Sequence, residues 1–490
     1  MEKTVVLYPG LVVTHFVPMT HLAGALLERG YAVTVALIDD RGVNEDVAFA
    51  AAVARAAASM PSVRFHTLPR AEDPPALAAD APFVLRYFDL VRRYNGRLRD
   101  FLCSVRVHAV IADLLNAEAL GVPQRLGIPG YILFTCNAAV LAVFAQLPTV
   151  RAVGGASFKE LGETPVDFFG VPPIPASHLF GEMLVDPNSD IYKATMASLS
   201  QIPDADGILV NTFESLEARA VAALRDLRCL PGRTMPPVYC VGPFAGGLSK
   251  APKERHECLA WLDGQPDCSV VFLCFGSAGN HSEEQLKEIA LGLENSGHRF
   301  LWVIRAPISD DPDKPFDALA DPNLDSVLPD GFLERTSSHG LVVKLWAPQV
   351  DVLRHRAIGA FVTHCGWNSV LEALMAGVPM LCWPLYAEQK MNKVLMVEEM
   401  KVGVELVGWQ QRLVKASELE GKVRLIMDSE EGRELRLRAA AHKEGAAAAW
   451  DDGGSSCAAF DRFMSDADKQ NSQALSQRQT KLSLRLPGDS

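Results

Sequence analysis

Short apolar runs alternate with longer amphipathic stretches along most of the chain, and this pattern predicts strands joined by helices. The apolar runs of the first half are Thr4–Tyr8, Tyr31–Ile38, Val63–Leu68, Ala109–Ala112, Tyr131–Thr135, Gly207–Thr212 and Val238–Val241. Those of the second half are Ser269–Phe275, Phe300–Ile304, Leu341–Leu345, Ala360–Thr363 and Met380–Trp383. Strands that alternate with helices form parallel sheets covered on both faces. The sequence therefore predicts an α/β protein with two Rossmann-like domains that face a cleft.

Changes in composition place the expected domain boundaries. We expect an N-terminal domain over 1–243, a linker containing Gly, Ser and Pro over 244–258, and a C-terminal domain over 259–450. A last helix over 451–466 is expected to pack back on the N-terminal domain. Residues 467–490 are rich in Gln, Ser, Lys and Arg, and they are expected to form a disordered tail.

One stretch of the second half combines the groups that a nucleotide sugar needs. A predicted strand ends at His364, and Asn368 and Ser369 open a helix whose N-terminal N–H groups and dipole suit a phosphate. A flat indole, a carboxylate one turn along the helix and two polar side chains after the next strand complete the set: Trp346, Glu372, Glu388 and Gln389. Taken singly, these residues have plainer interpretations, as a core tryptophan, helix caps and a solvated carboxylate.

The same stretch resembles the signature of plant family-1 UDP-dependent glycosyltransferases. The letters W-A-P-Q, H-C-G-W-N-S, E, P and E-Q stand at the spacing of that signature between Trp346 and Gln389. The resemblance runs over roughly Thr4 to Met464, and it implies a GT-B fold. It also implies a donor site in the C-terminal domain and an acceptor site in the N-terminal domain.

The resemblance implies a role for each residue of the signature. The indole would stack on uracil, and a glutamine and a glutamate would contact the ribose. An imidazole and the start of the helix would hold the diphosphate, and the remaining residues would face the sugar. The implied donor-binding residues are Thr135, Ser277, Trp346, Ala347, Gln349, His364, Trp367, Asn368, Ser369, Glu372, Glu388 and Gln389. Gln389, where some members have His, favours glucose as the sugar.

Two residues at the carboxyl ends of first-half strands are candidates for acid–base chemistry. His15 lies in an expected loop, Pro9–Val17, which precedes an expected helix from Pro18 to Arg29, and Asp113 follows the fourth strand. A carboxylate beside an imidazole fixes its tautomer and stabilises its charged form. Alone, a histidine after a strand is usually structural and an aspartate usually caps a helix. The resemblance implies that His15 is the catalytic base and Asp113 its partner.

The charge and cysteine content narrow the possible partners. The formal charge is −12 without a long basic run, which argues against nucleic acid or an anionic membrane. Ten cysteines lack C-x-x-C spacing, and we expect reduced thiols in the cytoplasm. We find no signal peptide and no apolar run long enough to span a membrane. No Asp-x-Asp pair follows an apolar strand, so we expect no metal, and we expect a monomer.

These observations predict the inverting, metal-independent transfer of glucose from UDP-glucose to a hydroxyl of a small phenolic acceptor. The stretches Pro172–Pro175 and Asn211–Phe213 resemble the subgroup that acts on flavonoids. A C-glycosyltransferase is the nearest alternative, because a phenolate also presents carbon. An NAD(P)-dependent oxidoreductase is disfavoured, because no G-x-G-x-x-G follows the first strand of either half. A UDP-sugar-binding module without turnover is the alternative outside enzymes.

Overall fold

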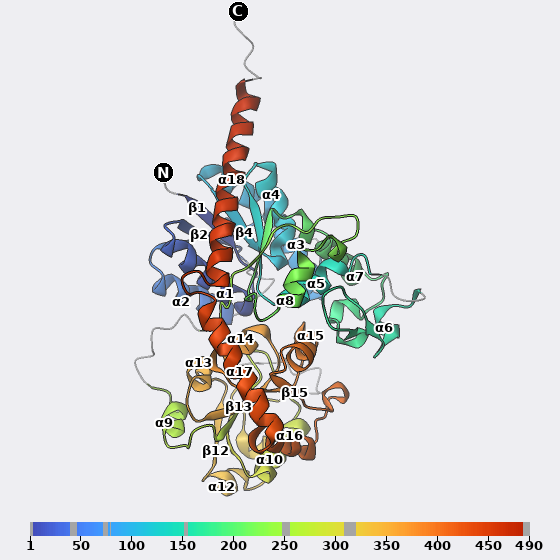
Figure 1. Ribbon diagram of the computed structural model, residues 1–490, viewed down its shortest axis with the longest axis vertical. Coiled ribbons are helices and arrows are strands. Elements are labelled where there is room, and N and C mark those ends of the chain that lie inside the picture. Colours follow the sequence, from blue (N-terminus) through green and yellow to red (C-terminus); the bar gives the residue numbers. More distant parts are fainter. Residues whose placement is uncertain are drawn as a thin grey trace, which may run out of the picture. The chain divides into compact units, whose positions relative to one another are not determined.

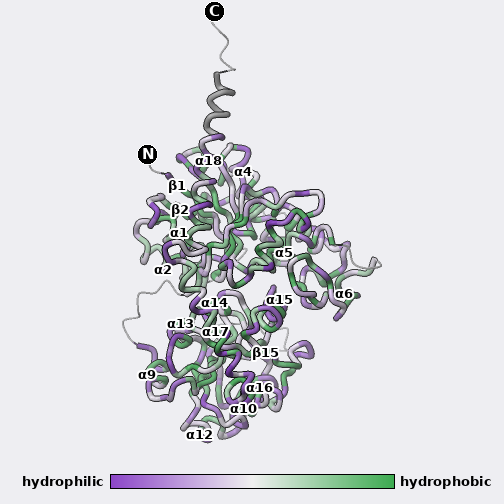
Figure 2. Tube along the Cα trace, in the orientation of Figure 1, coloured by the Kyte–Doolittle hydropathy of each residue, from purple (hydrophilic) through white to green (hydrophobic). Residues whose placement is uncertain are grey.

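Two parallel sheets organise the chain, one in each of two compact units. The computed structural model describes residues 3–39, 47–71, 77–78, 80–150, 155–246, 255–307 and 320–483. The first unit comprises Met1–Ser177, Glu182–Lys250 and Ala448–Ser490, and the second comprises His178–Gly181 and Ala251–Ala447. Figure 1 labels the elements of both units. Apolar residues concentrate on the central strands of each unit (Figure 2).

The first unit is built on a seven-stranded sheet in the order β3-β2-β1-β4-β5-β8-β9, with every neighbouring pair parallel. Its strands are β1 (Thr4–Tyr8), β2 (Ala32–Leu37), β3 (Val63–Thr67), β4 (Ala109–Asp113), β5 (Gly130–Phe134), β8 (Gly207–Val210) and β9 (Val238–Cys240). The central strands β4, β5 and β8 are buried along their whole length, and β1 is buried from Val5 on, as their continuous apolar runs predict. Tyr8 of β1 pairs with Ala112 of β4, so the carboxyl ends of these strands are adjacent.

Helices and short segments connect these strands. The helices of the first unit are α1 (Val13–Glu28), α2 (Val47–Ser59), α3 (Phe83–Ser104), α4 (Gly121–Arg125), α5 (Ala138–Gln146), α6 (Phe158–Leu161), α7 (Asp190–Leu199), α8 (Ala218–Leu224) and α18 (Ser455–Ser483). A 3-10 helix, η1 (Leu114–Leu120), follows β4, and β6 (Pro165–Val166) pairs with β7 (Ile174–Pro175) in a small antiparallel sheet.

Helix α1 begins earlier than the sequence predicts. The expected loop Pro9–Val17 is wrong over its second half, because the helix starts at Val13 and Pro18 lies inside it. The carbonyl of Val12 accepts N–H bonds from both His15 and Phe16, at 3.0 and 2.9 Å, so the helix has formed its first turn before the proline. Proline has no backbone N–H and is tolerated in the first turn of a helix, so the sequence predicted a helix that begins at Pro18. His15 therefore lies in the first turn of a helix.

The second unit is built on a six-stranded parallel sheet in the order β12-β11-β10-β13-β14-β15. Its strands are β10 (Val270–Cys274), β11 (Arg299–Ile304), β12 (Gly340–Lys344), β13 (Ile358–Thr363), β14 (Met380–Cys382) and β15 (Gly403–Glu405). Its helices are α9 (Glu257–Asp263), α10 (Glu283–Ser296), α11 (Leu324–Val327), α12 (Phe332–Thr336), α13 (Gln349–Leu353), α14 (Trp367–Ala376), α15 (Gln389–Val394), α16 (Ala416–Asp428) and α17 (Glu430–Ala448).

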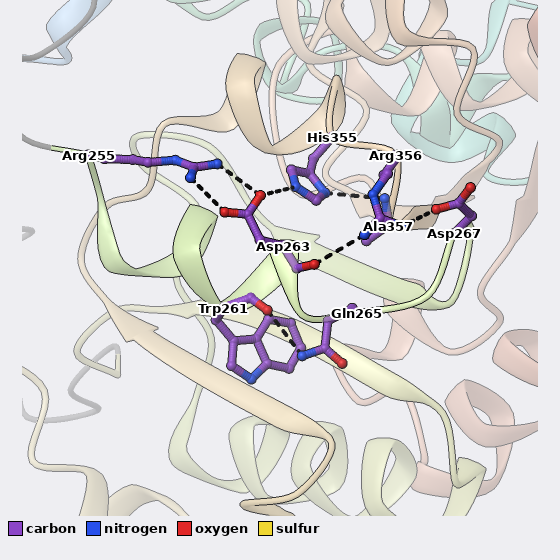
Figure 3. A network of polar contacts seen from close by, with 8 residues as sticks. All are labelled: Arg255, Trp261, Asp263, Gln265, Asp267, His355, Arg356 and Ala357. Carbon is purple, nitrogen blue, oxygen red and sulfur yellow. Dashed lines mark hydrogen bonds and ion pairs between the residues drawn. The ribbon is translucent and has the colours of Figure 1, made fainter.

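A polar network fixes the amino-terminal edge of this second sheet (Figure 3). The guanidinium of Arg255 donates to both oxygens of Asp263, at 2.6 and 3.0 Å, and His355 Nε2 lies 3.2 Å from the same carboxylate. Arg356 donates to the backbone carbonyl of Asp263 at 3.1 Å and to the carboxylate of Asp267. The network joins the end of α9 to the turns that precede β10 and β13. It lies at the edge opposite the strand ends that carry the site.

Helix α18 corrects the expected tail. The sequence predicts a helix that ends near Met464 and disorder from residue 467, but the helix continues to Ser483. Lys3 Nζ lies 2.7 Å from the carboxylate of Asp468, and the amide of Asn471 lies 2.8 Å from His108 Nδ1. Asp468 and Asn471, in the stretch expected to be disordered, are thus bound to Lys3 and His108 of the same unit. Composition alone does not show such partners.

Other expectations fall partly or wholly outside the described residues. Of the expected linker 244–258, residues 247–254 lie outside them. Phe244, expected in the linker, is 5% exposed, and its N–H and carbonyl both bond to the side chain of Asn211. Across the ranges that the structure describes, no helix is long and apolar enough to cross a membrane.

Candidate active site

An imidazole and a carboxylate meet at the carboxyl ends of β1 and β4. His15 Nδ1 lies 2.9 Å from Asp113 Oδ2 and 3.1 Å from Oδ1. The side chain of Asp113 is fully buried, whereas that of His15 is 28% exposed. A carboxylate only accepts hydrogen bonds, so Nδ1 carries a proton and donates, which makes Nε2 the ring nitrogen that can take up a further proton. The structure thus brings together the two residues that the sequence singled out for acid–base chemistry.

Asp113 also caps the helix that follows it. Its Oδ1 accepts the backbone N–H of Leu115 at 2.9 Å, at the start of η1. A Cβ at Gly10 would lie 2.8 Å from Asp113 Oδ1, so only glycine leaves room for the carboxylate there. The capping and catalytic interpretations of Asp113 are therefore compatible, because one carboxylate oxygen caps the turn while both face the imidazole.

Thr135 lies on a tightly held turn at the same edge. It follows β5, the neighbour of β4, and it is 7% exposed. Asn137 caps α5 through the N–H of Val140 at 2.8 Å, and the buried carboxylate of Glu217 accepts the N–H groups of Ala138 and Ala139 at 2.9 and 3.0 Å. The hydrogen bonds at the start of α5 thus fix the turn on which Thr135 lies.

In the second unit, three neighbouring strands end in register. Cys274 of β10 pairs with Thr363 of β13, which pairs with Cys382 of β14. The residues that follow these strand ends lie side by side at the carboxyl edge. His364 Nε2 is so close to this backbone that a Cβ at Gly276 would lie 2.6 Å from it, and one at Gly366 would lie 2.4 Å from it. Both positions require glycine because the imidazole occupies the space.

His364 is a neutral hydrogen-bonding group. It is 7% exposed, and burial lowers its pKa to about 4. Its Nδ1 is buried and has no hydrogen-bond partner among the described residues. The nearby helix α14 starts at Trp367, and Gly366 before it has no side chain that could cap the helix. The positive end of the α14 dipole therefore lies beside this imidazole, where it favours an anion.

Gln349 holds the face of α14 that the sequence assigns to ribose. Its amide nitrogen donates to Ser369 Oγ at 2.9 Å and to Glu372 Oε2 at 2.7 Å. Ser369 and Glu372 lie one turn apart on the helix, as their spacing predicts. Oε1, the other carboxylate oxygen of Glu372, accepts neither of these two bonds. The three residues form one hydrogen-bonded unit, with Gln349 fixing the carboxylate.

Trp346 presents an open indole beside this unit. It is 60% exposed, and it follows Leu345, whose φ of 64° turns the chain at the end of β12. The ring of His256 lies 5.8 Å from the indole at an interplanar angle of 75°. The next residue, Ala347, is 5% exposed. The exposed surface of Trp346 is large enough to stack on a base.

The residues expected to face the sugar differ in exposure. Gln389 is 2% exposed, and its Oε1 accepts the N–H groups of Leu385 and Tyr386, both at 2.9 Å. Its carbonyl therefore shapes the turn after β14, and only its amide nitrogen remains for a sugar. Glu388 is partly exposed, Ser277 is exposed, and Trp367 is 3% exposed. The contacts of these side chains with a sugar remain predictions.

Sequence reasoning missed three residues that support the site. Asn392 donates to the carbonyl of Cys365 at 2.9 Å and so ties α15 to the turn before α14. Asn116 donates to the carbonyl of Pro9 at 2.8 Å behind the His15–Asp113 pair. Arg305 follows β11 at the carboxyl edge, and burial lowers the pKa of its guanidinium. In the sequence, each of the three is a polar residue beside an apolar run, and no other pattern indicated a role for it.

Metal ligands do not gather in the described part of the chain. Within those ranges, no three His, Cys, Asp or Glu side chains lie close enough together to hold an ion. The arrangement instead offers a neutral imidazole, a helix N-terminus and a fixed carboxylate to a diphosphate and a ribose. Together with an open indole, these groups fit the donor site that the family resemblance implies, and His15 with Asp113 forms an acid–base pair in the other unit.

Comparison with known proteins identifies the family. Residues 198–440 match the family described as UDP-glucoronosyl and UDP-glucosyl transferase. The chain is 40% identical over 93% of its length to the anthocyanidin 5,3-O-glucosyltransferase of a Rosa hybrid cultivar, covering 97% of that protein. It is also 40% identical to the phloretin 2'-O-glucosyltransferase of Pyrus communis, over 95% of this chain and 99% of that one. This chain belongs to the UDP-glycosyltransferase family.

The solved structures agree with this assignment. Phytolacca americana UGT2 complexed with UDP-2fluoro-glucose and pterostilbene is similar with a TM-score of 0.82 at 32% identity, over 95% of this chain and 99% of that chain. The predictions of the family, the GT-B fold and a UDP-glycosyltransferase are confirmed. The oxidoreductase and the binding module without turnover are not favoured.

Proposed function

We propose that this enzyme transfers glucose from UDP-glucose to a hydroxyl of a small phenolic acceptor such as a flavonoid, with inversion at the anomeric carbon. The observation that carries the proposal is the hydrogen bond of 2.9 Å between His15 Nδ1 and the buried carboxylate of Asp113. It makes His15 a base with a fixed tautomer at the carboxyl edge of the N-terminal sheet. Family membership supplies the donor class.

The base acts on the acceptor. A phenol with a pKa of roughly 10 is little ionised at neutral pH. As the acceptor oxygen attacks the anomeric carbon, its proton passes to His15 Nε2, and Asp113 stabilises the imidazolium. The new bond joins the acceptor oxygen to the sugar, and the bond from the anomeric carbon to the diphosphate breaks. Attack from the side opposite UDP inverts the configuration.

The donor residues hold UDP and stabilise its departure. We assign the uracil to Trp346, the ribose hydroxyls to Glu372, and the diphosphate to His364 with the first N–H groups of α14. These are dipoles and neutral donors, and such groups stabilise developing charge when they are already oriented. Thr135, Glu388 and Gln389 are assigned to the sugar. The assignment requires no metal ion.

The acceptor class rests on the relatives. The two named above act on an anthocyanidin and on phloretin, and the Phytolacca americana enzyme was solved with pterostilbene. All three molecules are phenols. We therefore infer a phenolic acceptor and an O-glucoside product. A cytoplasmic location, suggested by the cysteine pattern, and a monomeric state remain expectations.

Incubation of the full chain with UDP-glucose, a panel of phenols and EDTA tests this function. We expect UDP release that depends on the phenol, and a β-configured O-glucoside in the NMR spectrum of the product. A carbon–carbon bond to the sugar would assign a C-glycosyltransferase instead. Binding of UDP-glucose without UDP release for any phenol would contradict the proposal, and activity only without EDTA would contradict metal independence.

A further inference from the structure

A buried polar cluster lies directly behind the His15–Asp113 pair. Tyr87 of α3 donates from its hydroxyl to Asn116 Oδ1 at 2.7 Å, and the hydroxyl oxygen of Tyr87 accepts the backbone N–H of Leu11 at 3.3 Å. The amide of Asn116 donates to the carbonyl of Pro9 at 2.8 Å and to that of Tyr8 at 3.4 Å. Tyr87 is 2% exposed and Asn116 is fully buried. The cluster thus binds the backbone on both sides of Gly10.

These bonds connect the two segments that carry the catalytic pair. Pro9 and Leu11 belong to the turn that leads into α1, where His15 lies in the first turn. Asn116 belongs to η1, the helix that Asp113 caps. The glycine between the two bound residues packs on Asp113, because a Cβ there would lie 2.8 Å from Oδ1. The cluster therefore sets the position of the His15 turn relative to the carboxylate.

We propose that Tyr87 and Asn116 are positioning residues for the catalytic base. They orient the β1–α1 turn so that His15 Nδ1 stays on the Asp113 carboxylate and Nε2 stays directed at the acceptor. This inference rests on the proposed function of His15. Small displacements of a reacting group are costly, since about 1 Å can lower a rate by about 10²-fold.

The same helix provides a matched control. Tyr94 lies two turns further along α3 and is 1% exposed. Its hydroxyl donates to the carbonyl of Asp39 at 2.8 Å and accepts the N–H of Ala71 at 3.4 Å. Tyr94 and Tyr87 are thus equally buried, and each hydroxyl makes one donated and one accepted bond. Only the hydroxyl of Tyr87 reaches the turn before His15.

The experiment compares Tyr87→Phe with Tyr94→Phe in the full chain. We expect Tyr87→Phe to lower kcat by about 10-fold to 100-fold. The KM for UDP-glucose should stay unchanged, and the acid limb of the pH profile of kcat should move to lower pH, because a displaced carboxylate stabilises the imidazolium less. Tyr94→Phe should keep the wild-type kcat and pH profile. Thermal unfolding then shows whether the two variants lose similar stability.

A double variant separates this inference from the proposed function. In a His15→Ala background, Tyr87→Phe should cause no further loss of kcat, because there is no imidazole to position. Equal kcat values for Tyr87→Phe and Tyr94→Phe, or a full additional loss in the His15→Ala background, would overturn the inference. If Tyr87→Phe does not fold, Asn116→Ser is compared in the same two backgrounds. Full activity of His15→Ala alone would remove the proposed base and with it the residues that position it.

Discussion

Two imidazoles of this enzyme, one in each unit, have opposite surroundings. His15 donates to a buried carboxylate and keeps 28% of its side chain exposed. His364 is 7% exposed, has no carboxylate on its ring, and has its pKa lowered to about 4 by burial. A carboxylate partner suits an imidazole that must gain a proton during the reaction. Burial without one suits an imidazole that must stay neutral and donate a hydrogen bond.

This difference explains how a protein of negative net charge can bind a UDP-sugar, which is also negatively charged. The chain has a formal charge of −12, and the residues assigned to the diphosphate are a neutral imidazole and backbone N–H groups. Oriented dipoles stabilise charge without a basic surface, because they are fixed before the ligand binds. In the proposed mechanism, the N-terminal unit contributes the acid–base pair, whose imidazole gains a proton during turnover.

The largest effect is expected when the surroundings of His15 are made similar to those of His364. Asp113→Asn keeps the shape of the side chain but removes the charge that stabilises the imidazolium. We expect kcat to fall by about 10²-fold to 10⁴-fold, the usual contribution of a general base. The affinity for UDP, measured by calorimetry, should not change.

Asp206→Asn is the control for this variant. Asp206 also presents a carboxylate that accepts one backbone N–H, from Gly130 at 2.8 Å, but it has no role in the proposed chemistry. Its substitution should leave kcat within error of the wild type. Equal losses in the two variants would show that Asp113 acts only on the fold.

A smaller effect is expected where His364 packs on backbone. In Gly276→Ala the new Cβ would lie 2.6 Å from His364 Nε2, at a φ of 76°. The imidazole must move, so we expect the KM for UDP-glucose to rise by about 10-fold. Gly297→Ala is the matched control, because its φ is 70° and nothing lies within 4 Å of the new Cβ.

Both glycine variants should lose about 1 kcal/mol of stability from the positive φ. Only Gly276→Ala should change the KM, as initial rates at varied UDP-glucose will show. If Gly297→Ala raises the KM to the same extent, the effect is due to backbone strain and not to His364.

The last expected effect is on stability and concerns His281, a third imidazole. It is 9% exposed between the rings of Phe275 and Trp383, at centroid distances of 4.3 and 5.0 Å, and burial lowers its pKa to about 3. Below about pH 6.5 the unfolded chain binds a proton that the folded chain refuses, so stability falls as the pH decreases. His281→Phe removes this difference.

Urea unfolding between pH 7 and pH 4 measures the effect. Relative to His281→Phe, the wild type should lose up to about 1.4 kcal/mol for each pH unit below 6.5. At pH 7 the variant should be at least as stable, because it replaces an unpartnered Nε2 in apolar surroundings. Parallel curves for the two proteins would contradict the neutral state assigned to His281.

The apolar runs predicted the sheets, and the family resemblance implied the pairing of His15 with Asp113. Parallel strands place their carboxyl ends on one edge, so residues that follow adjacent strands are close whatever the loops do. The spacing of Ser369 and Glu372 placed them one turn apart on one helix, but their hydrogen bonds to Gln349 were not predicted.

Other features depend on hydrogen-bond partners, near or distant in sequence, that hydrophobic periodicity does not reveal. Gln389 was assigned to the sugar, but its carbonyl bonds to two N–H groups of the preceding turn. The start of α1 before Pro18 depends on the carbonyl of Val12, and the extension of α18 depends on Lys3 and His108 of the first unit. The cluster of Tyr87 and Asn116 joins segments 29 residues apart.

The central claim, that His15 removes the acceptor proton, is tested most directly with phenols of graded acidity. The measurement is the ratio of kcat for wild type and His15→Ala at one pH along this series. For weakly acidic phenols we expect a ratio of about 10²–10⁴, and for phenols already ionised at the assay pH we expect it to approach one. A ratio that stays constant along the series, or equals one throughout, would contradict the account.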